Sequence, residues 1–144
     1  MKTDGNLAAR FLRWAERHGN AHPLWYYTLP LTLCIVAIMV ASLMPSSQVP
    51  KIRVSDKLVH GAMYAGLGWL LLRAWVRGRQ PTGAAVLLVG AIGAVWGLYL
   101  ECLQGLTPDR SFEILDEVFN IAGTFAGMIS WLGWNRVFLR ICGL

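Results

Sequence analysis

Apolar residues dominate four long stretches of the chain, and short polar or charged segments separate them. Residues 25–44, 58–76 and 83–101 each have the roughly 17–25 residue length that a helix needs to cross the hydrocarbon core of a bilayer. A fourth stretch, residues 114–134, carries polar residues in its first two turns and becomes cleanly apolar only after them. We therefore predict an all-α polytopic membrane protein, in which residues 25–136 form a four-helix transmembrane bundle.

The first 24 residues show a different pattern, with apolar and basic positions largely on separate sides of a helix over residues 6–18. The apolar face holds Leu7, Phe11, Trp14 and Ala15. Such a segment is typical of a short helix that lies in the membrane interface. Three aromatic residues at 25–27 then open the first span as an interfacial anchor. We expect residues 1–24 to form a cytoplasmic amphipathic segment and residues 137–144 a cytoplasmic tail.

The composition agrees with a membrane location. Of the 144 residues, 56% are hydrophobic and 15% are charged, and the mean hydropathy is +0.48. Soluble domains usually carry about a quarter charged residues, so this chain is poor in charge. Its three cysteines form no CxxC pair, so the sequence indicates neither a zinc site nor a disulfide framework.

The net charge of +5 follows the order of the spans, so it is a topology signal and argues against nucleic acid as a partner. Nine of the thirteen basic residues lie before the first span, between the second and third, or after the fourth. They are Lys2, Arg10, Arg13, Arg17, Arg73, Arg77, Arg79, Arg136 and Arg140. By the positive-inside rule these segments are cytoplasmic. We therefore expect a multi-pass protein of the cytoplasmic membrane with both termini inside.

Glycines recur in the third and fourth spans at spacings that keep them on one side of each helix. They are Gly90, Gly93, Gly97, Gly123 and Gly127. In lipid, small residues let helix backbones approach closely, and this close packing holds helices together. We expect these glycines to lie at helix–helix contacts.

Three of the predicted spans place a polar pair within about two turns of the outer boundary. The pairs are Asp56 with His60, Glu101 with Gln104, and Asp116 with Asn120. Residues three or four apart share a helix face, and ionisable groups at membrane depth are costly and usually functional. We expect the pairs to form one shared site. A structural alternative stays open, in which the aspartates cap helix starts and the amides hydrogen-bond between helices.

Three ordered segments, DKLVHGAMY, ECLQGLTPDR and DEVFNIAGTFAG, resemble the motifs of the VanZ-like family of small bacterial membrane proteins. The resemblance covers residues 43–127, and Gly61 departs from the aromatic residue that the family often has after the histidine. The matching positions are Asp56, Lys57, His60, Tyr64, Glu101, Gln104, Pro108, Arg110, Asp116, Asn120, Gly123 and Gly127. The resemblance implies a multi-spanning membrane protein from a family associated with resistance to the glycopeptide teicoplanin. It implies no settled biochemical activity.

The residue types in these segments offer acid/base chemistry and anion binding. The candidate catalytic residues are Glu101, His60, Asp116 and Asp56, because carboxyl and imidazole groups transfer protons. The candidate substrate-binding residues are Arg110, Lys57, Gln104, Asn120 and Tyr64. The guanidinium of an arginine suits bidentate recognition of phosphate or carboxylate. The chain contains no Ser–His–Asp arrangement, P-loop or HExxH motif, so a covalent serine mechanism is not indicated.

No cofactor is expected, although one ligand set stays open. Asp56 and His60, together with Glu101 and Asp116, supply nitrogen and oxygen atoms that suit a divalent cation. We favour a hydrogen-bonded layer of histidine and carboxylates, because a lysine and an arginine lie among these residues.

Three functions are compatible with this pattern. In the first, the protein is an enzyme that acts at the outer leaflet on a polyprenyl-phosphate-linked or peptidoglycan-precursor intermediate. In the second, it binds such an anionic envelope lipid without catalysis. In the third, it is a structural subunit whose polar layer locks the helices. A transporter is disfavoured, because the acidic residues gather at one face and not at the midplane of the predicted membrane domain.

The first prediction concerns topology. Reporter fusions at residue 144 and in the 77–82 loop are expected to report a cytoplasmic location, because basic residues concentrate in those segments. A periplasmic or external signal from either fusion would contradict this topology, and with it the outer position of the polar site.

Overall fold

The computed structural model describes residues 7–45, 55–77, 79–108 and 110–142. In order along the chain, the elements are α1 (Leu7–Ala21), the π-helical turn η1 (Leu24–Thr28), α2 (Leu29–Leu43), α3 (Asp56–Val76), α4 (Gly83–Gln104) and α5 (Ile114–Cys142). These described residues contain no strand, which confirms the predicted all-α class.

Two helical segments are long and apolar enough to cross a membrane. They are η1 with α2, over Leu24–Leu43, and α4, over Gly83–Gln104, with mean hydropathies of 1.9 and 2.0 in their most apolar parts. Helices α3 and α5 have sufficient length, with 21 and 29 residues, but they are less apolar. Apolarity therefore supports two of the four predicted spans, and the spans at α3 and α5 stay predictions.

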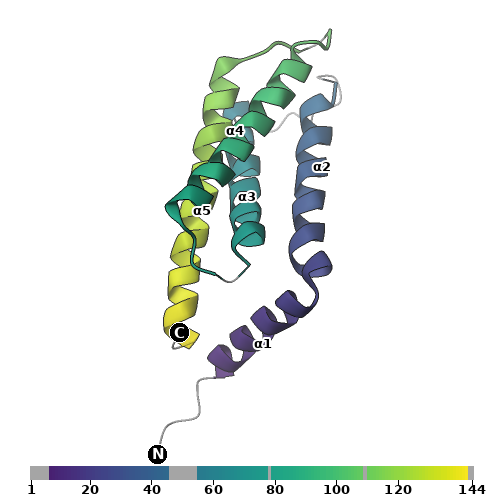
Figure 1. Ribbon diagram of the computed structural model, residues 1–144. Coiled ribbons are helices and arrows are strands. Elements are labelled where there is room, and N and C mark those ends of the chain that lie inside the picture. The colour runs from purple at the N-terminus through teal and green to yellow at the C-terminus, as the bar shows by residue number, and fades with distance from the viewer. Residues whose placement is uncertain (1–6, 46–54, 78, 109, 143–144) are drawn as a thin grey trace, which may run out of the picture.

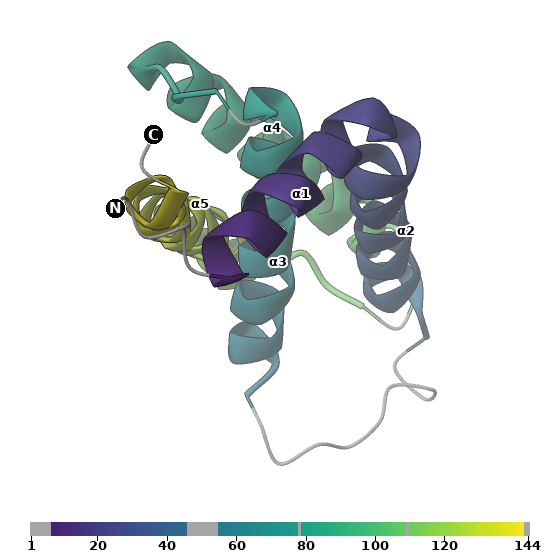
Figure 2. The ribbon, with the colours of Figure 1, turned by 90° about the horizontal axis from the view of Figure 1, so that it is seen from below.

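The four long helices run alongside one another, and α1 crosses at one end of them (Figure 1). Viewed from that end, α1 lies across the ends of the other helices (Figure 2). The C-terminal end of α5 lies at the same end of the molecule as α1, and the two helices are in contact. Residues 137–142, predicted as part of a tail, continue α5 as helix.

Helices α3 and α5 pack backbone against backbone. A side chain at Gly123 would overlap the backbone oxygen of Gly61, and one at Gly127 would overlap the backbone oxygen of Ala65. On the other helix, a side chain at Gly68 would overlap the backbone of Thr124. Only glycine permits this separation, so Gly123 and Gly127 lie at a helix contact as predicted.

The glycines of α4 face α5 in a different way, because they make room for its side chains. A Cβ atom at Gly97 would lie 2.6 Å from Glu117 Oε2, and one at Gly93 would lie 2.6 Å from Thr124 Cγ2. At Gly90 the nearest atom is Phe125 Cζ, at 3.0 Å. The third span therefore also uses its glycines at a helix contact, and two of them adjoin polar side chains of α5.

The bundle carries polar groups inside and apolar side chains outside. Several large apolar residues are more than half exposed, among them Leu33, Leu87, Val95 and Ile129. Buried polar residues include Glu101, Gln104, Asn120 and Thr124, each at most 2% exposed. An apolar exterior suits contact with lipid, whereas a soluble protein rarely exposes large contiguous apolar patches.

The close contact between α3 and α5 predicts a specific destabilisation. Gly127→Ala should lower the free energy of unfolding by about 1–3 kcal/mol, because the new methyl group overlaps backbone atoms of Ala65 and Trp69. Gly133→Ala is the matched control on the same helix, since nothing lies within 4 Å of its Cβ position. Denaturation in detergent, followed by circular dichroism, measures both variants. Equal stability of the two variants would contradict backbone-to-backbone packing at Gly127.

Candidate polar site

The predicted polar pairs meet at the end of the bundle opposite α1. The first turns of α3 and α5 and the last turn of α4 lie together there (Figure 1). Glu101 and Asn120 are 1% exposed, and His60 is 6% exposed. Glu101 therefore faces the interior of the bundle and not the surroundings.

His60, on α3, links the other two helices at the centre of this cluster. Its Nδ1 atom lies 3.1 Å from Asn120 Oδ1 on α5 and 3.7 Å from Glu101 Oε1 on α4. Since an amide oxygen only accepts hydrogen bonds, the contact with Asn120 favours a proton on Nδ1. Glu101 Oε2 and the Tyr64 hydroxyl are buried and have no hydrogen-bond partner among the described residues. The cluster therefore contains an imidazole beside a carboxyl group with one unused oxygen.

Glu117 belongs to this cluster, although the sequence analysis did not include it among the candidate site residues. Its Oε2 atom accepts a hydrogen bond of 3.3 Å from Asn120 Nδ2, and the residue is 8% exposed. The signal was present in the sequence, because Glu117 precedes Asn120 by three residues and so shares its helix face. The space for its carboxyl group comes from Gly97 on the neighbouring helix, which spacing along one helix does not reveal.

Lys57 holds the outer edge of the cluster together. Its Nζ atom lies 2.9 Å from Glu113 Oε2 and 3.2 Å from Asp116 Oδ1. The hydrogen bond from Lys57 and its positive charge lower the pKa of Glu113. Hydrogen bonds to Glu113 and then Asp116 raise the pKa of Lys57. Lys57 thus joins the start of α3 to the start of α5, and Glu113 is a second residue that the sequence analysis did not assign to the site.

Asp56, His60 and Asp116 offer a candidate set of metal ligands. One ligand atom from each lies within 4.8 Å of the others, and Asp56 is exposed while the other two are buried. The donor types suit a divalent cation. However, Lys57 already contributes positive charge to Asp116, and Glu101 is not a member of the set. The geometry is therefore compatible with a cation and equally with a hydrogen-bonded layer.

Gln104 and Arg110 contact the end of α2 rather than the acidic residues. Gln104 Nε2 donates a 2.7 Å hydrogen bond to the backbone oxygen of Ser42, and Arg110 Nη2 donates one of 3.2 Å to that of Met44. The last carbonyl groups of a helix lack partners within the helix, so these side chains satisfy them. Arg110 Nε is buried and has no hydrogen-bond partner among the described residues. Each side chain therefore has a structural contact, and the guanidinium keeps unused donors.

The structure thus brings most of the candidate residues into one region. His60 contacts Asn120 and Glu101, and Lys57 contacts Asp116. Ligand atoms of His60 and Asp116 lie within 4.8 Å of each other, which joins the two groups. Tyr64 lies a turn deeper, buried in an apolar cluster with Leu67 and Leu100.

The fold and the polar cluster define a small all-helical protein with membrane-length apolar helices and ionisable side chains gathered inside one end. The family model for VanZ/LLP1 matches residues 30–138, more than half of the chain. The protein therefore belongs to the VanZ/LLP1 family, which confirms the resemblance of its three motifs. Comparisons with curated proteins and with solved structures gave no match.

The contacts of Lys57 predict a change in the titration of Glu113. Because its pKa is lowered in the folded protein, Glu113 stabilises the fold above its ordinary pKa of about 4.3, and this contribution is lost as the pH falls through the lowered value. Lys57→Met should move the pKa of Glu113 back up to its ordinary range, so this contribution and its loss at low pH should both disappear. Carboxyl carbon shifts from NMR in detergent micelles measure this change. Arg79→Met, at the far end of the molecule, is the control, and an unmoved pKa in Lys57→Met would contradict the contact.

Proposed function

We propose that the polar cluster binds the phosphate-bearing headgroup of a cell-envelope lipid at the extracytoplasmic face of the cytoplasmic membrane, and that His60 and Glu101 move a proton on it. The observation that carries the proposal is the position of Glu101. Its carboxyl group is 1% exposed, lies 3.7 Å from His60 Nδ1, and has one oxygen without a partner among the described residues.

A carboxyl group at this position is costly to the fold. Burial of an ionised carboxylate is unfavourable unless hydrogen bonds and charges compensate it fully. In addition, Glu101 lies in the last turn of α4, where the partial negative charge of the helix end disfavours an anion. A residue that stabilised only the fold would not need a carboxylate here, so the group is better explained by proton transfer.

A path for protons supports this role. One ring nitrogen of His60 and carboxylate oxygens of Asp56 and Asp116 lie within 4.8 Å of one another, and Asp56 is exposed. His60 also adjoins Glu101. The proton on His60 Nδ1 can therefore pass to Glu101 while the other ring nitrogen takes one from Asp56 or Asp116, so a proton that Glu101 gives to a bound substrate is replaced from the exposed side.

The basic residues support the choice of a phosphate-bearing ligand. Lys57 lies at the edge of the cluster, and Arg110 retains donors beyond its contact with Met44. Guanidinium and ammonium groups together suit a phosphate ester. The substrate class we propose is a polyprenyl-phosphate-linked or peptidoglycan-precursor intermediate, through which the protein would affect susceptibility to glycopeptides such as teicoplanin.

A structural function is the second candidate, and specific contacts favour it. Gln104 and Arg110 bind the last carbonyl groups of α2, while His60 and Asn120 join α3 to α5. In this case the polar layer locks four helices together and binds no ligand.

Two variants separate these functions. Glu101→Gln should fold at normal yield and keep the bound lipid, but it should lose any effect on teicoplanin susceptibility, because general acid/base catalysis contributes about 10²–10⁴-fold. Arg110→Lys should retain roughly tenfold less lipid, since one lost charged hydrogen bond is worth about 1.5–3 kcal/mol. Native mass spectrometry of the purified proteins, beside susceptibility tests of cells that express them, gives both readouts.

Cys102→Ser and Arg79→Lys are the matched controls for these variants. Cys102 is the exposed neighbour of Glu101, and Arg79 lies in the connection between the end of α3 and the start of α4, away from the polar cluster. If wild type holds no lipid, and if Glu101→Gln and Arg110→Lys only lower the yield, the structural function is correct and the proposed one is wrong.

A further inference from the structure

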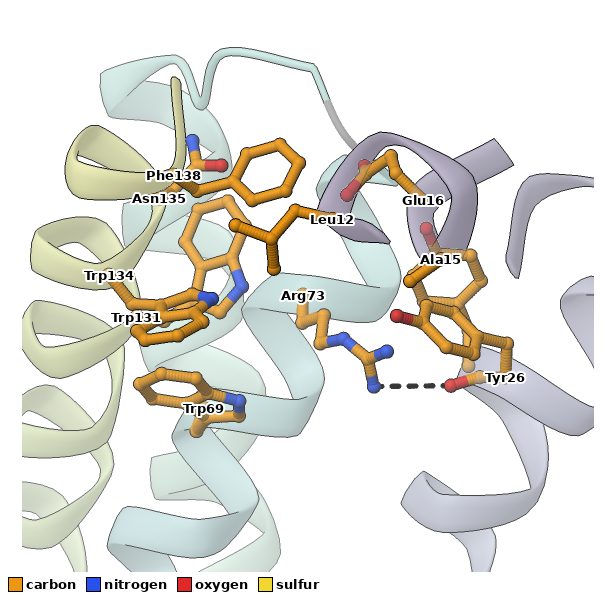
Figure 3. A pocket seen from close by; sticks show the side chains of 11 residues that line it. Leu12, Ala15, Glu16, Tyr26, Trp69, Arg73, Trp131, Trp134, Asn135 and Phe138 are labelled. Carbon is orange, nitrogen blue, oxygen red and sulfur yellow. Dashed lines mark hydrogen bonds between the residues drawn. The ribbon is translucent and has the colours of Figure 1, made fainter. Parts of the chain in front are cut away.

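A second region of the molecule, at the α1 end of the bundle, carries features that the polar cluster does not explain. A cavity of about 120 Å³ lies between α1 and η1 on one side and α3 and α5 on the other. Figure 3 shows Trp69, Trp131, Trp134 and Phe138 along one wall, with Arg73 reaching into the space in front of them. In the predicted topology this end is cytoplasmic.

A proline explains why Arg73 points into this cavity. Pro30 has no N–H group, so it cannot donate to the carbonyl group of Tyr26 four residues before it. Arg73 Nη1 donates to that oxygen instead, at 3.1 Å. The guanidinium carbon also lies 4.2 Å from the centre of the Tyr26 ring and 5.1 Å from that of Tyr27. These contacts orient the guanidinium and leave most of its five N–H groups available to a ligand.

Negative and neutral polar groups face the same cavity. Glu16 on α1 lines it, and no ion pair joins Glu16 to Arg73 in the described structure. Burial raises the pKa of Glu16, and the charge of Arg73 opposes that shift. Asn135 also lines the cavity, is 9% exposed, and its side chain takes part in none of the hydrogen bonds of the described residues. The cavity therefore contains a cation, an anion and an amide that takes part in no hydrogen bond among the described residues.

The aromatic residues add a surface for a second cation. Trp134 is 54% exposed, so this wall of the cavity is open to the exterior. Tryptophan rings attract ammonium groups and favour the level of the lipid headgroups. Helix α1, which covers the cavity, exposes Leu7, Phe11 and Trp14, as expected of a helix that lies in the membrane interface.

From this arrangement we infer that the cavity binds the headgroup of a zwitterionic phospholipid that carries a primary ammonium group, such as phosphatidylethanolamine. The phosphate binds the guanidinium of Arg73, and the ammonium group lies between Glu16 and the aromatic rings. Asn135 supplies a further hydrogen bond. The acyl chains lie outside, because about 120 Å³ holds roughly ten groups the size of water, which suits a headgroup and no more.

The charges favour a zwitterion over the alternatives. A purely anionic headgroup would bind Arg73 but would be repelled by Glu16, whereas a purely cationic ligand would be repelled by Arg73. The side chains of Arg73 and Glu16 are both partly removed from water, so salt screens their interactions with a bound headgroup less than it screens those of exposed groups. The inference is independent of the function proposed for the polar cluster, which lies at the opposite end of the bundle.

Native mass spectrometry of the full chain from nanodiscs tests the inference. The nanodiscs contain equal amounts of phosphatidylethanolamine and phosphatidylglycerol, and the retained lipids are counted for wild type, Arg73→Gln, Glu16→Gln and Arg77→Gln. Wild type should retain phosphatidylethanolamine in preference to phosphatidylglycerol. Arg73→Gln should lower that retention roughly tenfold, because it removes a charged hydrogen bond to phosphate.

Glu16→Gln is the decisive variant, because it leaves Arg73 and its contact with Tyr26 in place. It should reverse the preference towards phosphatidylglycerol, since only the cation remains in the cavity. Arg77 is an exposed arginine at the end of the same helix, and Arg77→Gln should leave both retentions unchanged. Glu101→Gln should also leave them unchanged, which distinguishes this site from the polar cluster.

Three results of this lipid measurement would overturn the inference, and a fourth comes from a soluble headgroup. The first is an equal retention of the two lipids by wild type, and the second is an unaltered preference in Glu16→Gln. The third is a loss in Arg77→Gln as large as that in Arg73→Gln, which would show general attraction to the membrane surface. Soluble phosphoethanolamine, added to lipid-free protein in detergent, should not bind measurably, and binding as tight as that of the lipid would refute a lipid source.

Discussion

The contact between the backbones of α3 and α5 determines the geometry of the whole bundle. Gly123 and Gly127 bring α5 against the carbonyl groups of Gly61 and Ala65. Because Gly123 lies about one turn and Gly127 about two turns from Asn120 on α5, the same contact places Asn120 beside His60 at hydrogen-bond distance. The polar cluster therefore depends on close packing, and a wider separation of the two helices would leave its buried groups without partners.

Helix α4, the third helix of the cluster, packs against α5 through its glycines and not through backbone contact. Helix α4 presents glycines to α5, and the space above Gly97 receives the carboxyl group of Glu117. Buried carboxyl groups are tolerated only where neighbouring groups compensate the loss of water. Asn120 donates to Glu117 Oε2, whereas Glu101 Oε2 has no hydrogen-bond partner among the described residues and Glu101 Oε1 lies 3.7 Å from His60 Nδ1. This difference is why Glu101, rather than Glu117, is assigned the chemical role.

The two ends of the bundle differ in the charged groups that they enclose. At the polar cluster, acidic groups are gathered inside the helices and Lys57 closes the edge. At the α1 end, one arginine lies among aromatic rings, and its partner carbonyl is made available by Pro30. Helix α1 covers this second site, while the first lies among the long helices (Figure 1).

The sequence by itself determined the all-α class, the family and the helix faces that carry the polar pairs, because periodicity and spacing are properties of one helix at a time. It also predicted the glycines at helix contacts. Only the tertiary structure decided that Glu117 joins the cluster, that Gln104 and Arg110 bind the end of α2, and that Arg73 faces Glu16 across a cavity. Each of these results depends on which helices are neighbours and how closely their backbones approach, and spacing along a single helix contains neither quantity.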